Sequence, residues 1–263
     1  MFAFVEKLKR KLDDNQPPIA RGGKEFSAEL EKFAQMIEQR QPFAFARFND
    51  GEMKILFGDI FDVAKNRIGN TYIPNDEVAE RQRTLLKEAL QFKADGYHVG
   101  IVCPCCEKDA DFFRMKELSG QGEEHLTWAN VFVNSNFPIF QSRINPLFSG
   151  RKVIFIGNTL ANHNGLPFYV RKKFNIGDNA WVNDYEHLLS EMNDYIESEK
   201  LSDAVFIFCA GVLSNLLIYK LYDRFPSNTY LDLGSVFDVE LGLGKTRRYL
   251  RKGKTLYKTC VWA

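Results

Sequence analysis

Two carboxylates separated by one glycine stand in the stretch Asn49, Asp50, Gly51 and Glu52. If the backbone turns at Gly51, which glycine permits, Asp50 and Glu52 converge on one divalent cation. Carboxylate oxygens suit Mg²⁺ or Mn²⁺, and these ions also bridge the phosphates of a nucleotide. Arg47 lies just upstream and could pair with a phosphate or hold a carboxylate. The alternative is a surface turn with Glu52 near a helix N-terminus, where a negative charge is favourable.

Further polar residues follow other apolar runs of the chain. Asp232 and Asp238 flank the end of one run, where a carboxylate is costly to desolvate unless it is paired or bound to a ligand. They are candidate site residues, with turn formation or helix capping as the alternative. Asn158 and His163 follow another run and either contact a base or sugar or cap the next helix. His163 is also a candidate general base.

Two segments are candidates for binding phosphate. Gly211, Ser214 and Asn215 open a strongly periodic helix, and a helix N-terminus presents free N–H groups to an anion. The segment is neither a full dinucleotide fingerprint nor a P-loop, so its signal is weak. Arg247 and Arg248 follow a glycine-containing stretch that would let the chain bend back over the strand ends. They would then reach a diphosphate or a phosphate-bearing acceptor, unless they belong to a solvated basic tail.

The five cysteines are clustered unevenly, with Cys103, Cys105 and Cys106 together and Cys209 and Cys260 apart. This pattern is not that of a secreted disulfide framework. A Cys-x-x-Cys pair can be a redox pair or half of a zinc site. Because no second pair with ligand spacing exists, we interpret the thiols as buried or strand-end side chains and expect no stoichiometric zinc.

Alternating strands and helices must position these residues. Short apolar runs predict buried strands at 43–48, 97–102, 153–156, 204–209 and 230–233. Helical patterns occupy 76–92, 108–118, 184–198 and 213–225, and another helix begins with Ser27 as its cap. This alternation predicts an α/β, Rossmann-like fold, a mostly parallel sheet with helices on both faces. Ligands of such sheets bind at the carboxyl ends of the strands, where the polar residues above stand.

Composition is that of an ordinary globular protein, with 45% apolar and 26% charged residues. We expect residues 1–25 to form a basic amphipathic helix and a linker, and residues 26–263 to form one domain. The net charge of +1 gives no field that would attract nucleic acid. Because we find no signal peptide and no membrane-spanning run, we expect a cytoplasmic protein. We expect residues 1–13 to pack on the domain, and the alternative is that they make weak contact with the inner face of the membrane. The oligomeric state is not predicted.

Two blocks resemble the GT-D-type glycosyltransferases, a family formerly known as a domain of unknown function. The stretch 45–52, FARFNDGE, resembles that family's R-x-G-D-G-E segment. The block 205–238, with CAGVLSNLLIYKL and YLDLGSVFD, resembles its strand, glycine turn, helix and D-x-G-x-x-x-D. The resemblance covers roughly residues 27–260. It departs at Asn49, where the family often has glycine, and at Ser235, where it often has histidine.

The resemblance implies a metal-dependent enzyme that moves a sugar from a nucleoside-diphosphate sugar, expected to be UDP-linked, to a glycan, glycoprotein or lipid-linked acceptor. Mn²⁺ or Mg²⁺ would be held by Asp50 and Glu52, and with basic side chains it would stabilise the leaving diphosphate. A carboxylate or histidine would assist the acceptor hydroxyl. The expected catalytic residues are Asp50, Glu52, His163, Asp232 and Asp238, and the expected donor-binding residues are Arg47, Asn49, Gly51, Asn158, Gly211, Ser214, Asn215, Arg247 and Arg248.

Two other readings stay open. One is a different enzyme on the same fold, such as a methyltransferase or a nucleotide hydrolase. A methyltransferase usually has a glycine-rich turn after its first strand, whereas the first such loop here is acidic. The other is a non-catalytic nucleotide- or sugar-binding protein of a polysaccharide pathway.

Overall fold

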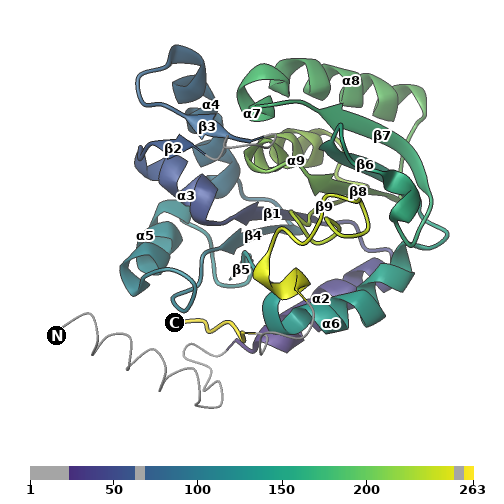
Figure 1. The fold of residues 1–263 in the computed structure, drawn as a ribbon, viewed down its shortest axis with the longest axis horizontal. Helices are drawn as coiled ribbons and strands as arrows, with labels where there is room; N and C mark the ends of the chain where they lie inside the picture. Colours follow the sequence, from purple (N-terminus) through teal and green to yellow (C-terminus); the bar gives the residue numbers. More distant parts are fainter. Residues whose placement is uncertain (1–23, 63–68, 252–257) are drawn as a thin grey trace.

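A seven-stranded sheet, parallel throughout, forms the centre of the computed structural model, which describes residues 24–62, 69–251 and 258–263 (Figure 1). The strand order is β5-β4-β1-β9-β8-β6-β7. The strands are β1 (Ala44–Phe48), β4 (Tyr97–Ile101), β5 (Leu126–Trp128), β6 (Lys152–Asn158), β7 (Val170–Ile176), β8 (Ala204–Cys209) and β9 (Thr229–Asp232). The predicted α/β, Rossmann-like class is confirmed, and all six strand pairings of the sheet are parallel.

The five predicted strands are the buried inner strands, and the two that were not predicted lie at the edges. Inner strands such as β4 are buried along their whole length, which is why they are continuous apolar runs. β7 carries Arg171, Lys172 and Lys173, and its burial alternates, as expected for an edge strand protected by charge. β5 has only three residues, too few to give a periodic pattern.

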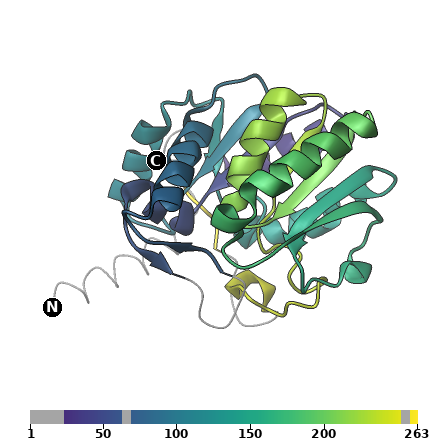
Figure 2. The same ribbon diagram turned by 90° about the horizontal axis from the view of Figure 1, so that it is seen from above.

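Helices cover both faces of the sheet. On one face α9 (Val212–Arg224) lies between α4 (Glu77–Gln91) and α8 (Tyr185–Ser198), and the three helices run side by side in the view from above (Figure 2). Residues 212–218 of α9 are all buried, because its neighbours and the sheet enclose it. α5 (Asp109–Ser119) packs beside α4, and the short α7 (Ala180–Asn183) precedes α8.

The opposite face is covered by α2 (Phe26–Glu38) and by short helical turns within 134–148, which include α6 (Phe137–Ile139). The predicted cap of α2 is wrong. The Glu25 carboxylate accepts the Ser27 and Ala28 backbone N–H groups at 3.3 and 3.0 Å, so Ser27 lies in the first turn. Phe33 of α2 packs on Phe45 of β1 with ring centroids 5.5 Å apart.

The sequence analysis assigned no helical segment directly after β1, but its alternative that Glu52 lies near a helix N-terminus is confirmed. α3 (Asp50–Phe57) begins where a turn at Gly51 was expected, and that turn is therefore absent. Gly51 serves a different purpose, since a Cβ there would lie 2.8 Å from the Phe61 ring. Phe61 belongs to β2 (Phe61–Asp62), which pairs antiparallel with β3 (Thr71–Tyr72) beside the sheet.

The direction in which the chain adds strands to the sheet reverses between β1 and β9. From β1 the chain adds β4 and then β5 on one side, whereas on the other side it forms β6 and β7 at the edge and returns inwards through β8 to β9. Such a switch point opens a crevice at the carboxyl ends of the two central strands. Here those ends are Phe48 and Asp232.

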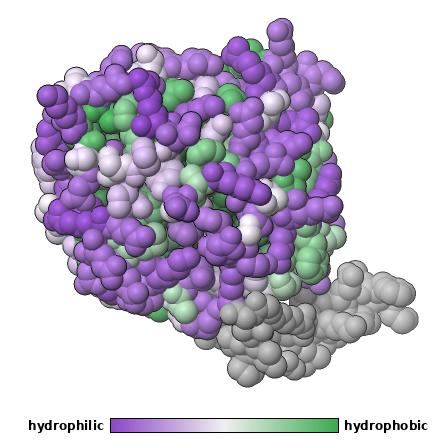
Figure 3. Space-filling model, turned by 180° about the vertical axis from the view of Figure 1, so that it is seen from behind, coloured by the Kyte–Doolittle hydropathy of each residue, from purple (hydrophilic) through white to green (hydrophobic). Residues whose placement is uncertain are grey.

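The rear surface of the molecule is mainly hydrophilic, with hydrophobic residues scattered among the polar ones (Figure 3). In the part of the chain that the structure describes, no helix has both the length and the apolarity needed to span a bilayer. The predicted membrane-contacting helix at 1–13 lies outside the described residues.

Candidate functional site

A cavity of about 210 Å³ lies at the switch point, over the carboxyl ends of β1 and β9. The rest of its wall comes from the residue before α3, the turn after β4 with Cys106, the stretch after β5, the loop after β9 and the C-terminal segment 247–249. Its lining includes Arg47, Asn49, Asn130, Asn134, Asp232, Ser235, Arg247, Arg248 and Tyr249. The structure therefore brings together five of the residues predicted for the site from three distant stretches of sequence.

Arg47 and Asp232 form a charge pair in the lining of this cavity, with the Asp232 side chain buried and the Arg47 side chain partly exposed. Their Nε and Oδ1 atoms are 3.8 Å apart, and the Asp232 side chain is only 1% exposed. Asp232 Oδ1 also accepts the Gly234 backbone N–H at 3.0 Å. Among the described residues, Arg47 Nε and Asp232 Oδ2 have no hydrogen-bond partner. Buried polar atoms are nearly always satisfied, so this pair is suited to a polar ligand.

Burial sets the protonation of the carboxyl groups around Arg47. It raises the pKa of Asp232 to about 7, although the Arg47 charge opposes that rise. Burial also raises the pKa of Glu52, again against the effect of Arg47. Asp232 therefore exchanges its proton near neutral pH, the range in which a general base works best.

The two carboxylates of the D-x-E motif point in different directions. Consecutive helical residues are about 100° apart, so positions 50 and 52 of α3 differ by about 200° around the helix. Glu52 is buried, and its Oε2 accepts the Asn49 backbone N–H at 2.9 Å, as in a capping box. Asp50 is exposed, and its Oδ1 accepts Asn49 Nδ2 at 3.1 Å. Asp50 thus remains accessible to a cation, whereas Glu52 stabilises the helix start.

Gly234 lets the Arg47 guanidinium lie against the backbone after β9. Its φ of +53° is in the left-handed region, and a Cβ there would meet Arg47 Nη2 at 2.6 Å. A side chain at this position would therefore strain the backbone and displace the arginine.

We expect Gly234→Ala to destabilise the chain more than the control variant Gly242→Ala does. Gly242 also has a positive φ, +73°, but a Cβ there meets no atom within 4 Å. The control therefore carries only the backbone penalty, roughly 1 kcal/mol, and the clash with Arg47 is added at position 234. Urea unfolding of both variants measures the difference, and equal losses of stability would contradict the proposed contact.

The C-terminal segment supplies residues that the sequence analysis assigned only in part. Arg247 and Arg248 are exposed and line the cavity. Tyr249, which was not predicted, lies between them and the strand ends. Its hydroxyl is 3.0 Å from Ser235 Oγ, and burial raises its pKa to about 12, so it stays protonated. Its sequence position gives no local signal, because the contact depends on the chain folding back.

Asn158 is the last residue of β6 and His163 lies in the loop that follows, and both are outside the described lining of the cavity. Asn158 Oδ1 accepts the Leu160 backbone N–H at 2.7 Å, so it shapes the loop. The His163 ring packs edge-on against Phe155 with centroids 4.8 Å apart, and burial lowers the pKa of His163. In this structure their observed contacts are those of loop residues, and their predicted roles in the site stay predictions.

Gly211, Ser214 and Asn215 lie at the start of α9, also outside the described lining. Gly211 faces Asn70, whose Nδ2 would be 2.4 Å from an added Cβ. Ser214 Oγ accepts the Ala210 backbone N–H at 3.3 Å, so the hydroxyl closes the turn. Asn215 is fully buried, and neither polar atom of its side chain has a hydrogen-bond partner among the described residues. A phosphate at this helix start stays a prediction.

Asp238 is outside the described lining of the cavity, so its predicted catalytic role stays a prediction, and its carboxylate accepts a hydrogen bond from the Thr246 hydroxyl. This bond ties the loop after β9 to the segment that carries Arg247. Burial raises the pKa of the neighbouring Cys209, and the charges of Asp238 and Asp232 raise it further. Asp238 is thus close enough to Asp232 for both charges to act on one thiol.

The positions of the cysteines differ from the prediction in one respect. Cys260 does not stand apart, because its Sγ lies in one group with those of Cys103, Cys105 and Cys106. The prediction that Cys260 stands apart from the clustered cysteines is therefore wrong, whereas the interpretation of the thiols as buried or strand-end side chains without stoichiometric zinc stays a prediction. Cys209 lies at the end of β8 and does not belong to the group.

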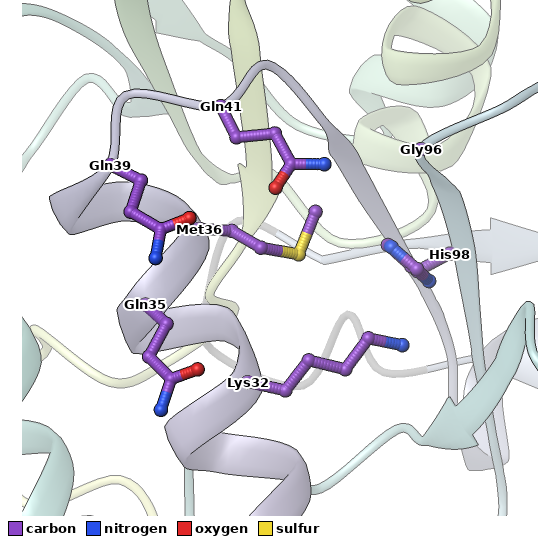
Figure 4. Close-up of a pocket in the computed structure, with 7 residues that line it drawn as sticks. All are labelled: Lys32, Gln35, Met36, Gln39, Gln41, Gly96 and His98. Atoms are coloured by element: carbon purple, nitrogen blue, oxygen red, sulfur yellow. The ribbon is translucent and has the colours of Figure 1, made fainter.

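A larger hollow of about 350 Å³ lies at the opposite, amino-terminal edge of the sheet (Figure 4). Neutral amides and one lysine dominate its wall, which consists of Lys32, Gln35, Met36, Gln39, Gln41, Gly96 and His98. Burial lowers the pKa of His98 to about 3, so its ring is neutral. None of the predicted site residues lines this hollow, and ligands of parallel sheets bind at the other edge.

No protein-family model matches the sequence, and no curated protein matches it significantly. Solved structures are similar over 88% of the chain. One is a selenomethionine form of the domain of unknown function 1792, with a TM-score of 0.56, 14% identity and 85% of that chain covered. Another, described as having a distinct glycosyltransferase fold, has a TM-score of 0.55 with the same identity and coverage. A third, described as a new glycosyltransferase from Streptococcus sanguinis, has a TM-score of 0.51, 11% identity and 88% covered. The chain thus has the fold of the domain of unknown function 1792, a distinct glycosyltransferase fold.

Proposed function

We propose that this protein is a glycosyltransferase that binds a nucleoside-diphosphate sugar in the cavity between β1 and β9. The observation that carries the proposal is the Arg47–Asp232 charge pair, in which Arg47 Nε and Asp232 Oδ2 are buried and have no hydrogen-bond partner among the described residues at the switch point of the sheet. Similarity to chains described as glycosyltransferases supports the reaction class.

Cationic side chains would bind the diphosphate of the donor. Arg47, Arg247 and Arg248 all line the cavity. Arginine matches phosphate oxygens with two parallel N–H donors, and its charge is retained at any relevant pH. The donor diphosphate is already anionic and gains one more negative charge as the glycosidic C–O bond breaks, so these arginines would bind the donor and stabilise the transition state more strongly.

Asp232 is the proposed general base. It lines the cavity, and its pKa of about 7 allows it to take the proton of an acceptor hydroxyl at neutral pH. Arg47 would orient the carboxylate and limit its pKa, because the same burial without the arginine would hold the proton more tightly. Tyr249 stays neutral and can donate a hydrogen bond to the donor or acceptor.

Asp50 is the residue that we propose for a divalent cation. Mg²⁺ and similar ions commonly take only one or two carboxylates from the protein and complete their coordination with substrate phosphates and water, a mode that suits a single exposed carboxylate. Asp50 directly follows Asn49, which lines the cavity, so Asp50 lies near it. When bound, such a cation neutralises charge on the diphosphate. Glu52 would support it indirectly by fixing the start of α3.

Calorimetric titration with UDP, with and without Mn²⁺, tests the proposal together with assay of donor hydrolysis. Binding with turnover is the expected outcome. Binding without turnover of any donor would favour a nucleotide-binding protein, and no binding of UDP, GDP or dTDP would refute the proposed donor site.

Asp50→Ala should lower Mn²⁺-stimulated donor hydrolysis at least tenfold while the melting temperature changes little. Asp109→Ala is the matched control, because Asp109 is likewise an exposed aspartate at the first position of a helix, α5. Both variants lose the same small interaction with a helix N-terminus. Only the Asp50 variant should need more Mn²⁺ for half-maximal activity. An unchanged Mn²⁺ requirement would remove Asp50 from the metal assignment.

A further inference from the structure

The four cysteines outside β8 form a compact group built from two distant parts of the chain. Cys103, Cys105 and Cys106 lie in the turn after β4, and Cys260 lies near the C-terminus. Their Sγ atoms are all within 4.8 Å of one another, with 3.3 Å between Cys103 and Cys105 and 3.9 Å between Cys106 and Cys260.

These spacings match one metal ion better than the alternatives. A disulfide requires sulfur atoms about 2.05 Å apart, closer than the pairs observed here. Four thiolates at about 2.3 Å from a tetrahedral zinc lie about 3.8 Å from each other. An iron–sulfur cluster would hold its cysteines farther apart, because its own iron and sulfide atoms lie between them. The size of the group thus favours a single ion.

The surroundings of the sulfur atoms also suit thiolates. Three N–H groups point at them: Asn134 Nδ2 lies 3.2 Å from Cys260 Sγ, Val261 N lies 3.4 Å from Cys105 Sγ, and Asn130 Nδ2 lies 3.5 Å from Cys106 Sγ. Such N–H···S contacts fix the orientation of metal ligands and reduce their charge.

Contacts on both sides of Cys260 hold its backbone in place. Before it, Lys258 O accepts the Ser135 backbone N–H at 2.9 Å, and the Lys258 ammonium donates to Cys105 O. After it, the buried Trp262 ring packs against Trp128 with centroids 5.0 Å apart, and its Nε1 donates to Glu123 at 3.1 Å. The fourth thiol is therefore positioned by packing that does not depend on a metal.

We propose that Cys103, Cys105, Cys106 and Cys260 bind one structural Zn²⁺ that fastens the C-terminal segment to the turn after β4. All four tetrahedral positions are filled by protein thiolates, so the site has no open position for catalysis. The ion displaces the thiol protons on binding, and no oxidant or reductant takes part. This proposal does not depend on the glycosyltransferase activity.

Elemental analysis of the purified full chain tests the proposal. We expect one zinc per chain in the wild type, and an apo form that takes up one Co²⁺ with the strong visible and thiolate charge-transfer absorption of a tetrahedral thiolate site. Cys106→Ser and Cys260→Ser should each lower the zinc content at least tenfold. Cys260→His should keep the zinc, because imidazole replaces thiolate in Cys₃His sites. Cys209→Ser is the matched control and should keep the zinc, since Cys209 lies outside the group.

A wild-type measurement covers the case in which a serine variant does not fold. Titration of the folded chain with a mercurial thiol reagent, in the presence of a chromogenic chelator, should release one zinc as the four thiols react. Zinc removal by a chelator should also lower the melting temperature. Absence of zinc both in the purified chain and after incubation of the reduced chain with zinc sulfate would overturn the proposal. So would stoichiometric iron, or disulfides among these cysteines in protein prepared under reducing conditions.

Discussion

Asp232→Asn should lower the kcat of sugar transfer, and of donor hydrolysis, by roughly 10²- to 10⁴-fold, the usual contribution of a general base. Asparagine keeps the size of the side chain and the acceptor for the Gly234 N–H, but it cannot take a proton. We therefore expect donor affinity to change much less than kcat, since the arginines that would bind the diphosphate remain.

The measurement is a steady-state assay of nucleotide release together with calorimetric binding of UDP. If kcat stays within about threefold of wild type while the variant is folded, Asp232 is not the base. If donor binding is lost together with activity, Asp232 acts in binding and the assignment of roles must change.

Arg47→Gln should destabilise the chain more at pH 8 than at pH 5. Arg47 opposes the raised pKa of Asp232, so its loss should move that pKa above about 7. A carboxyl group whose folded-state pKa is raised contributes stability that is fully present below its unfolded pKa of about 3.9 and is lost as the pH rises through the folded pKa. In the wild type this loss of stability is complete near pH 7. In the variant it continues to higher pH, and it grows by about 1.4 kcal/mol for each unit by which the pKa of Asp232 rises.

Urea unfolding at pH 5 and pH 8 measures this difference. Glu52 should add to it in the same direction, because burial raises its pKa and Arg47 opposes the rise. Adding Asp232→Asn to the variant should remove the part of the pH dependence that Asp232 causes. Equal destabilisation at both pH values would show that Arg47 does not control the ionisation of Asp232.

Local sequence patterns predicted the centre of the fold and failed at its edges. β8 was predictable because a strand covered on both faces must be apolar throughout. β7 was not, because an edge strand carries the charged residues of a surface segment. α3 did have a signal that was not used: Asn49 followed three residues later by Glu52 is the spacing of a capping box.

The candidate site was predictable only for reactive residues that stand near the end of a predicted strand. Asp232 ends β9 and Arg47 lies one residue before the end of β1, so their meeting follows from the parallel topology. Tyr249 and Cys260 come from a segment whose position depends on tertiary packing, and no residue spacing in the sequence encodes it. The same limit explains why three clustered cysteines did not predict a group of four.

The central claim is that a nucleotide sugar is cleaved in the cavity between β1 and β9. A screen of UDP-, GDP- and dTDP-sugars with Mn²⁺, read out as released nucleoside diphosphate, tests it most directly when the wild type and Asp232→Asn are compared side by side. The account predicts that the wild type releases nucleotide from at least one donor and that the variant, folded to the same extent, releases at least a hundredfold less. No release from any donor, or equal release by both proteins, would contradict it.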